Sequence, residues 1–310
     1  MIAVLGSVNL DLIVKAERLP SIGETVSGSE FLMAPGGKGA NQALAARRAG
    51  SSVRLAGAVG SDDFAAIATR LLKEGGVDLR GVQARSVSTG VGMILVDKRG
   101  ENMITVVPGA NGTVSPVDAE RLVADLDVDD VLLIQLEIPL PTVAAALSSC
   151  AKKGVRAVLN IAPYTPDAAA LAQLASVVIA NETEMSGLVG RAVAGSGPDL
   201  DDALSTLHAA TGASYIVTLG GEGAVGIERG TLARARALPI SPVDTVGAGD
   251  AFCGYFASGL ERRITFQAAL ARAAIAGSLA CMAHGAQTSI PLFSEVDRHS
   301  WQDSPAPHRT

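Results

Sequence analysis

The chain of 310 residues has few aromatic side chains: phenylalanine, tyrosine and tryptophan together make up 3% of it. Apolar residues still account for 48%, so the core must be built mainly from alanine, valine, leucine and isoleucine. Charged residues are also scarce, at 18%, with 25 basic against 31 acidic. The net charge of −6 disfavours a general surface for nucleic acid or an anionic membrane, so an anionic ligand must be held locally.

Cysteine and histidine are sparse as well. Cys150, Cys253 and Cys281 are far apart and show neither a disulfide framework nor metal-ligand spacing, which indicates a reducing, cytoplasmic environment. The four histidines show no zinc-ligand spacing. The most apolar stretch, 268–283, is interrupted by an arginine and predicts a buried helix, not a membrane span. The start, Met1–Gly6, has no basic run and predicts a first strand, not a signal peptide.

What the sequence does contain is a regular alternation of short β-type runs and alanine-rich helical runs. Strands are expected at Ile2–Leu5, Val53–Val59, Val131–Leu136, Val155–Asn160, Val177–Ala180, Tyr215–Leu219 and Ala224–Glu228, and helices at Gly39–Ala49, Phe64–Gly75, Thr142–Lys153, Ala168–Leu174, Leu200–Thr211 and after Gly249. Buried strands that alternate with helices predict an α/β fold with a largely parallel sheet covered on both faces. We expect a single domain over residues 1–310.

Two segments break this alternation, because they carry β-type residues and turns but no helical pattern. They are Leu12–Met33 and Thr89–Pro108; in the second, residues 94–100 predict a hairpin and 103–107 its return strand. We expect strands within about 12–33 and 89–108 to form a small sheet that projects from the main domain. Such a sheet is suited to be a lid or a dimer surface, although simple edge hairpins also explain the pattern.

The segment 243–252 (VDTVGAGDAF) places three small residues, Gly247, Ala248 and Gly249, directly before Asp250 and an apolar helical run. Small residues before a helix leave backbone N–H groups bare, and the helix N-terminus adds partial positive charge, which together suit a phosphate. A carboxylate there makes sense if it takes a proton from a hydroxyl that attacks a phosphoryl group. A helix N-cap explains Asp250 equally well.

Polar side chains also follow the first predicted strand. Asn9 and Asp11 alternate along an extended segment, so both point to one side. An amide beside a carboxylate suits a polyol, although turn chemistry explains the pair too. The glycine-rich segment 35–42 (PGGKGANQ) leads into a helix on which Lys38 and Asn41 share a face. It is not a Walker A sequence, and a glycine-rich turn with a solvated lysine is the alternative.

Two more segments follow later strands. Asn181 and Glu184 stand three apart after residues 177–180, where Glu184 could hold Mg²⁺ through water or simply belong to a helix cap. Residues 221–226 match G-x-G-x-x-G, but a strand is expected directly afterwards, where a dinucleotide site needs a helix. A tight turn that passes a nucleotide fits better. The sequence contains no G-x-S-x-G, so it lacks the elbow of serine hydrolases.

In this order, these segments are similar to the motifs of the ribokinase-like (pfkB) family of carbohydrate kinases. The resemblance covers residues 4–291 and is carried above all by 36–42 (GGKGANQ) together with 244–250 (DTVGAGD). The motifs that narrow it toward ribose-phosphorylating members are Asn9 with Asp11, residues 135–137 and residues 285–291. The resemblance implies a three-layer α/β/α fold with a mostly parallel central sheet and a small projecting β-sheet lid.

The resemblance also implies an activity and a set of site residues. ATP would donate its γ-phosphate to the 5-hydroxyl of D-ribose, with Asp250 as catalytic base and Gly247, Ala248 and Gly249 as anion hole. The implied sugar contacts are Asn9, Asp11, Gly37, Lys38, Asn41, Glu137 and Asp250. The implied nucleotide contacts are Asn181, Thr218, Gly220, Gly221, Glu222, Gly223 and Gly249. Glu184 would act on Mg²⁺ through water, and an activating K⁺ would lie beside Asp244, Val246, Ala280, Ala283, Gly285 and Ser289.

The sequence departs from the family at Ala274, where some relatives have a histidine near the adenine, and at Ala283, where some have arginine. Sibling kinases for deoxyribose, fructose or a nucleoside are alternatives, although the scarcity of aromatics disfavours a nucleoside pocket. A non-catalytic sugar-binding regulator is disfavoured by Asp250, since a binder needs no base. A Rossmann dehydrogenase is disfavoured by the strand expected over 224–228. We expect a homodimer formed through the lid sheets, with no nucleic-acid or membrane partner.

Overall fold

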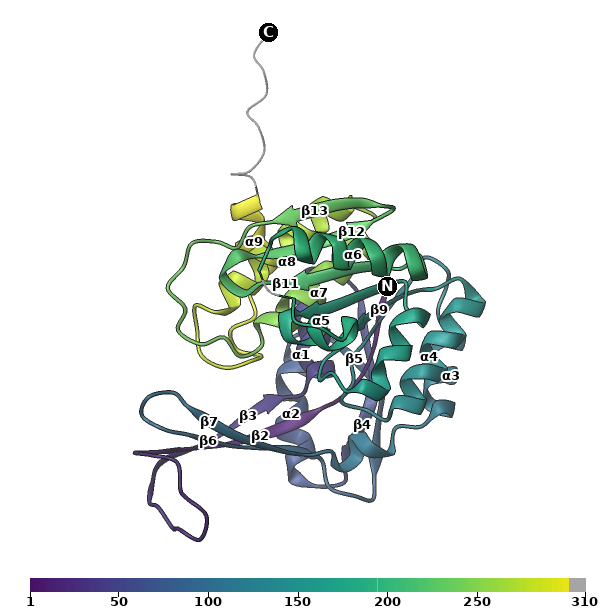
Figure 1. Cartoon of the computed structure of the whole chain (residues 1–310). Helices are drawn as coiled ribbons and strands as arrows, with labels where there is room; N and C mark the ends of the chain where they lie inside the picture. The colour runs from purple at the N-terminus through teal and green to yellow at the C-terminus, as the bar shows by residue number, and fades with distance from the viewer. Residues whose placement is uncertain (194, 301–310) are drawn as a thin grey trace.

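The structure, a computed structural model, describes residues 1–193 and 195–300. The expectation of one domain over 1–310 extends to residues 194 and 301–310, which lie outside the described part. A nine-stranded sheet with helices on both faces forms the main body, and a four-stranded sheet projects from it (Figure 1). The expected three-layer α/β/α fold with a small projecting sheet is therefore confirmed. Within the described residues, no helix is long and apolar enough to cross a membrane.

The central sheet is parallel except at one edge. Its strands, in spatial order, are β13 (Thr231–Ala235), β12 (Ala224–Glu228), β11 (Ser214–Thr218), β10 (Val177–Asn181), β9 (Arg156–Asn160), β8 (Val131–Ile134), β1 (Ile2–Leu5), β4 (Val53–Gly60) and β5 (Asp78–Arg85). The pairs β11–β12 and β12–β13 are antiparallel. The carboxyl ends of β1, β8, β9, β10 and β11 therefore meet at one edge of the sheet, which is where open α/β proteins bind ligands.

Helices form a layer on each face of this sheet. One layer contains α1 (Lys38–Arg48), α2 (Asp63–Glu74), α7 (Ala248–Glu261), α8 (Phe266–Ala280) and α9 (Phe293–Ser300). The other contains α3 (Pro116–Ala124), α4 (Leu140–Lys153), a 3₁₀ helix (Pro166–Leu174), α5 (Glu182–Val189) and α6 (Pro198–Thr211). Alternate residues of β1 serve both layers: Ile2 and Val4 pack into the first, whereas Ala3 and Leu5 pack into the second.

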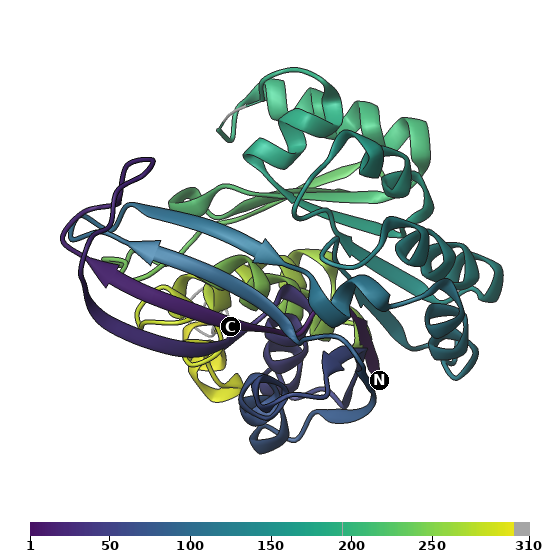
Figure 2. The same ribbon diagram turned by 90° about the horizontal axis from the view of Figure 1, so that it is seen from below.

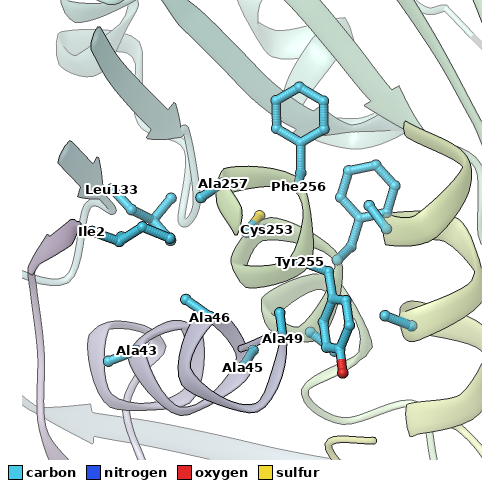
Figure 3. Packing of buried hydrophobic residues seen from close by; sticks show 14 of the residues in the cluster. Ile2, Ala43, Ala45, Ala46, Ala49, Leu133, Cys253, Tyr255, Phe256 and Ala257 are labelled. Carbon is cyan, nitrogen blue, oxygen red and sulfur yellow. The ribbon is translucent and has the colours of Figure 1, made fainter. Parts of the chain in front are cut away.

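Small residues allow α1 and α7 to pack closely, as a core poor in aromatics requires. Figure 3 shows alanines of α1, among them Ala45 and Ala46, beside the α7 residues Cys253 and Ala257. A Cβ on Gly254 of α7 would lie 2.5 Å from the Ala45 Cβ and 2.7 Å from the Gln42 carbonyl oxygen, so only glycine permits this approach. The contact holds the middle of α1 against the second turn of α7.

The small sheet is built from two distant parts of the chain. Its strand order is β3 (Gly28–Gly36), β2 (Asn9–Ala16), β6 (Gly90–Val96) and β7 (Asn102–Val107). The middle strands β2 and β6 are parallel, and each pairs antiparallel with its outer neighbour. Figures 1 and 2 show the sheet extending away from the main body. The predicted hairpin over 94–100 with its return strand over 103–107 is confirmed.

Some elements differ from the sequence-based expectation. The helix expected at 168–174 is present, but as part of a 3₁₀ helix. The strands β5 and β13 and the helix α3 were not expected. β5 is an edge strand of largely polar residues, so its period-2 pattern is weak. α3 begins with a capping box between Ser115 and Asp118, a local signal that the sequence does contain.

Candidate active site

Gly247 introduces α7 in a left-handed conformation, with φ 80° and ψ −4°. A Cβ on Gly247 would also lie 2.8 Å from the Cα and the carbonyl oxygen of Ala286, so both backbone conformation and packing require glycine here. The N–H groups of the first turn have no acceptors within the helix and carry its partial positive charge. The predicted anion-hole residues Gly247, Ala248 and Gly249 thus lie together with Asp250 at one helix N-terminus.

Asp250 is held by two amide side chains from the first turn of α1. Asn41 Nδ2 donates to Asp250 Oδ2 at 2.8 Å, and Gln42 Nε2 donates to Asp250 Oδ1 at 2.9 Å. Burial raises the pKa of Asp250, whereas Lys38 and these two donors act in the opposite direction by favouring the carboxylate. The N-cap of α7 is Gly247, and no side chain caps this helix, so the explanation of Asp250 as an N-cap is wrong.

A cavity of about 220 Å³ opens beside Asp250. Its polar lining includes Lys38, Asn160, Asn181, Glu184, Thr218 and Asp250, with Gly247 and Gly249 next to them. Burial alone would lower the pKa of Lys38, but the charges of Asp250, Glu137 and Glu184 raise it above its usual value. Burial also raises the pKa of Glu184. A cation therefore sits among several carboxyl groups, an arrangement that suits a phosphate bound with a metal ion better than a free anion.

Glu137 connects the start of α1 with the small sheet. The Lys38 backbone N–H donates to Glu137 Oε2 at 3.0 Å, and the Ser7 hydroxyl donates to the same oxygen at 2.5 Å. Burial and the charge of Glu137 raise the pKa of Asp11 to about 6. The predicted sugar contacts Asp11, Glu137 and Lys38 are therefore neighbours, and Gly37 directly precedes Lys38 as the N-cap of α1.

Glycines surround Asn9 and Asp11 on the small sheet. Asn9 pairs with Gly36 on one side and Gly90 on the other, and Asp11 pairs with Gly92. A Cβ on Gly36 would lie 2.3 Å from Asp11 Oδ2, and one on Gly92 would lie 2.5 Å from Asp11 Oδ1. Without these glycines the Asp11 carboxylate could not keep its position.

Several supporting residues were not among those predicted from the sequence. Asn111 Nδ2 donates to Asn9 Oδ1 at 2.7 Å, which leaves the Nδ2 donors of Asn9 for a ligand. Gln42, Gln135 and Asn160 lie behind Asp250 and are joined by hydrogen bonds. Gln42 and Gln135 lie within motifs that carry the family resemblance, so their positions offered a signal. Asn111 and Asn160 carry no local pattern.

Adjacent strands bring the first two predicted nucleotide contacts together. Asn181 of β10 lies opposite Thr218 of β11 in the strand register. Asn181 and Glu184 also form a reciprocal capping box, in which each side chain accepts the other's backbone N–H at 2.8 Å. The helix-cap explanation is thus confirmed, and Glu184 lines the cavity as well.

Four of the remaining nucleotide contacts lie beyond the end of β11, whereas Gly249 belongs to α7 and lines the cavity around Asp250. Gly220, Gly221 and Glu222 form a 3₁₀ turn (Gly220–Glu222) that does not line the cavity around Asp250. Gly223 has φ 100°, and a Cβ there would lie 2.0 Å from the Ala235 carbonyl oxygen. The strand β12 follows directly, which confirms that this G-x-G-x-x-G sequence lacks the helix of a dinucleotide site.

Five of the six predicted cation ligands lie in two loops that Asp244 joins, and Ala280 is the last residue of α8. The Asp244 carboxylate accepts the backbone N–H of Val246 at 3.0 Å and that of Gly285 at 2.9 Å. The Ser289 hydroxyl is buried and has no hydrogen-bond partner among the described residues. Ala283 lies in the exposed turn that follows α8. A buried hydroxyl without a hydrogen-bond partner fits an oxygen ligand of a weakly hydrated cation.

Comparison with known proteins identifies the family. The profile of the pfkB family of carbohydrate kinases matches residues 1–292. A ribokinase of Lactococcus lactis subsp. lactis is 34% identical over 95% of this chain and 95% of its own. A deoxyribokinase of Salmonella typhi is 33% identical over 96% of this chain and 98% of its own.

Solved structures agree with this result. The structure of Arabidopsis thaliana ribokinase complexed with ribose and ATP has a TM-score of 0.88 and 29% identity to this chain. It covers 96% of this chain and 98% of its own length. The chain therefore belongs to the pfkB family of carbohydrate kinases, and it is an enzyme that phosphorylates a sugar.

Proposed function

We propose that this enzyme transfers the γ-phosphate of ATP to the 5-hydroxyl of D-ribose, giving ribose 5-phosphate and ADP. The observation that carries the proposal is Asp250, a buried carboxylate at a helix N-terminus whose two oxygens are each held by an amide. It shares a cavity with Lys38. Relatives named ribokinase and a similar structure with ribose and ATP support this pair of substrates.

In the proposed reaction the protein orients the sugar and takes up one proton. Asn9 donates to a sugar oxygen, and Asp11, Asn41 and Glu137 engage further hydroxyls. Asp250 accepts the 5-hydroxyl proton as that oxygen attacks the γ-phosphorus, and the bond to the ADP oxygen breaks. General-base catalysis of this kind is worth roughly 10²–10⁴ in rate. The N–H groups of Gly247–Gly249 stabilise the charge on the transferring phosphoryl group.

The nucleotide and the metal ions have proposed positions around this centre. Asn181, Thr218 and residues 220–223 would hold ATP at the ends of β10 and β11. Glu184 would hold Mg²⁺ through water, where the ion would neutralise phosphate charge. Asp244, Val246, Ala280, Ala283, Gly285 and Ser289 would hold K⁺, several through backbone carbonyls. The close packing of Gly247 against Ala286 supports a link between that cation and the anion hole.

We propose that residues 1–310 act as one kinase domain, with the strands of about 12–33 and 89–108 as a lid over the sugar. The sheet face that carries Asp11 also carries Leu32, Ile104 and Val106, which are 40%, 55% and 50% exposed. A second copy of the chain would cover these side chains and form a homodimer. Light scattering of Ile104→Asp should then report a lower mass than the unmodified protein. The three free cysteines are in keeping with a cytoplasmic enzyme.

A substrate panel tests the proposed activity. ADP release would be measured with ATP, Mg²⁺ and K⁺ against D-ribose, 2-deoxyribose, fructose and a nucleoside, and the phosphorylated position would be assigned by NMR. We expect the highest kcat/KM for D-ribose and a 5-phosphate product. Deoxyribose is the second candidate, because a deoxyribokinase is nearly as similar to this chain as the ribokinases. A higher kcat/KM for another acceptor would overturn the assignment of ribose.

A further inference from the structure

We propose that Gln42 is a positioning residue that holds Asp250 as an oriented, ionised carboxylate, and that Gln135 and Asn160 fix the Gln42 amide for this task. The inference rests on the proposed role of Asp250 as the base. Gln42 lies behind Asp250 as part of a buried network, and its part in the reaction is exerted only through Asp250.

Both N–H bonds and the oxygen of the Gln42 amide are engaged in hydrogen bonds. Its Nε2 donates to Asp250 Oδ1 at 2.9 Å and to Asn160 Oδ1 at 3.0 Å, so both of its N–H bonds are engaged. Its Oε1 accepts from Gln135 Nε2 at 2.6 Å. Gln42 therefore joins α1 to α7, to the end of β9 and to the residue that follows β8.

The direction of this amide is fixed from both sides. Asn160 Nδ2 donates to the Ile179 carbonyl at 3.2 Å, which turns Asn160 Oδ1 toward Gln42. A flipped Gln42 would place its oxygen against two acceptors, Asp250 Oδ1 and Asn160 Oδ1, and its NH₂ group against that of Gln135. Each of these contacts is repulsive, so only one orientation of the Gln42 amide satisfies its own donors and acceptor.

Glycine in the backbone provides space for the network, and its four side chains are buried. A Cβ on Gly6 would lie 2.1 Å from Gln135 Oε1, so glycine at this position makes room for the Gln135 side chain. Gln42 and Gln135 are 0% exposed, while Asn160 is 8% and Asp250 is 7% exposed. A hydrogen bond in such surroundings is stronger than one in water, and its loss leaves a buried charge without a partner.

Other charged or titratable groups face Asp250 from several elements: Lys38 on α1, Glu137 after β8, Glu184 on α5 and Cys253 on α7. Gln42 differs from all of them because an amide does not titrate in the working pH range. Its donated hydrogen bond therefore favours the carboxylate form of Asp250 at every pH. Removing the bond should raise the pKa of the base.

The test is the pH profile of Gln42→Met, a variant of similar length without hydrogen-bonding groups. We expect the acid limb of kcat to move up by about one pH unit, and kcat at pH 7 to fall by up to about tenfold. KM for sugar and nucleotide should change by less than about twofold, because Gln42 lies behind Asp250. If kcat of Gln42→Met fell by the same factor at every pH, the proposal would be overturned.

Two further variants secure the result. Gln135→Met leaves Gln42 in place but removes its anchor, so we expect a smaller shift of the acid limb in the same direction. If Gln42→Met does not fold, an unshifted limb in Gln135→Met overturns the proposal. Ser258→Ala is the matched control: its buried hydroxyl on α7 contacts Ser51 Oγ at 2.8 Å, and its loss should lower stability without moving the limb.

The test also separates this inference from the proposed function. If Asp250→Asn kept full activity, Asp250 would not be the base. Gln42 could then have no role through it. An inactive Asp250→Asn together with an unshifted acid limb in both glutamine variants would overturn only the positioning role.

Discussion

Asp250 on α7 is buried and Asp11 on the small sheet is half-buried, and the groups around the two carboxylates differ. Asp250 accepts hydrogen bonds from two amides, and these favour its charged form. Asp11 has the carboxyl group of Glu137 as a neighbour, which raises its pKa further than burial alone. In the proposed mechanism the base is therefore held in place by the protein itself, whereas Asp11 would gain its hydroxyl donors from the sugar.

The largest effect is expected from a change at Asp250, the carboxylate that two amides hold in place. Asp250→Asn keeps the shape of the side chain but cannot accept the hydroxyl proton, so kcat should fall by roughly 10²–10⁴. Binding of ATP and ribose, measured by calorimetry, should be largely preserved, because the anion hole is made of backbone N–H groups. Retention of full activity would contradict the role of Asp250 as base.

Substitution of a glycine beside Asp11 tests the proposed contact of this carboxylate with the sugar. In Gly92→Ala the new Cβ would lie 2.5 Å from Asp11 Oδ1, so the carboxylate must move. A displacement of this size should raise KM for the sugar about 10- to 100-fold, while KM for ATP stays close to its original value. Gly112→Ala is the control, since the nearest atom to its Cβ is 3.6 Å away. Equal KM values in the two variants would show that the space around Asp11 is not needed.

The pH dependence of sugar affinity sharpens the comparison. With a pKa of about 6, Asp11 is mostly protonated at pH 5 and ionised at pH 7.5. A carboxylate accepts hydroxyl hydrogen bonds better than a carboxylic acid, so KM for the sugar should be about tenfold higher at pH 5 than at pH 7.5. Asp11→Asn should bind more weakly and lose this dependence. A wild-type KM that is constant over this range would contradict the expectation.

Stability without sugar should depend on pH in the opposite direction. The pKa of Asp11 lies above its usual value of 3.8, so the folded protein holds this proton more tightly than the unfolded chain. The contribution of Asp11 to the free energy of unfolding is therefore present at low pH and is lost as the pH rises through about 6. A thermal-melting series of wild type and Asp11→Asn between pH 4 and 7 would measure the difference.

The smallest effect concerns the cation. Replacement of K⁺ by Na⁺ should lower kcat severalfold, because the turn at 285–289 packs against Gly247 and would lose an ion that fits it. Ser289→Ala should weaken the response to K⁺, measured as activity against salt concentration at constant ionic strength. Equal rates in K⁺ and Na⁺ would remove the monovalent cation from the proposed mechanism.

Much of the fold could be predicted because its signals are local. Apolar runs of strand length alternate with helical patterns, and hairpin residues mark the small sheet. β5 was missed because an edge strand with polar side chains has little periodicity. The segment 168–174 was predicted as a helix but not as a 3₁₀ helix, because an alanine-rich run does not distinguish 3₁₀ from α geometry.

The network around the base could not be predicted from local pattern. Gln42 lies 118 residues from Asn160 and 208 residues from Asp250. Their contacts depend on how closely α1 approaches α7, which glycine at position 254 decides. Asn41 and Gln42 are also adjacent in the sequence, yet both reach Asp250, because the carboxylate offers one oxygen to each.

The order of the chain has a consequence for synthesis. Asn41 and Asp250 are 209 residues apart, and apart from Asp250 itself the sugar contacts predicted from the sequence all lie N-terminal to the proposed base. A ribosome makes the N-terminal part first, so the small sheet and the start of α1 emerge long before α7. If the proposed roles hold, a nascent chain or a C-terminally truncated product would carry the proposed sugar contacts without the proposed base. Phosphoryl transfer would then become possible only when the last helices have been translated and packed.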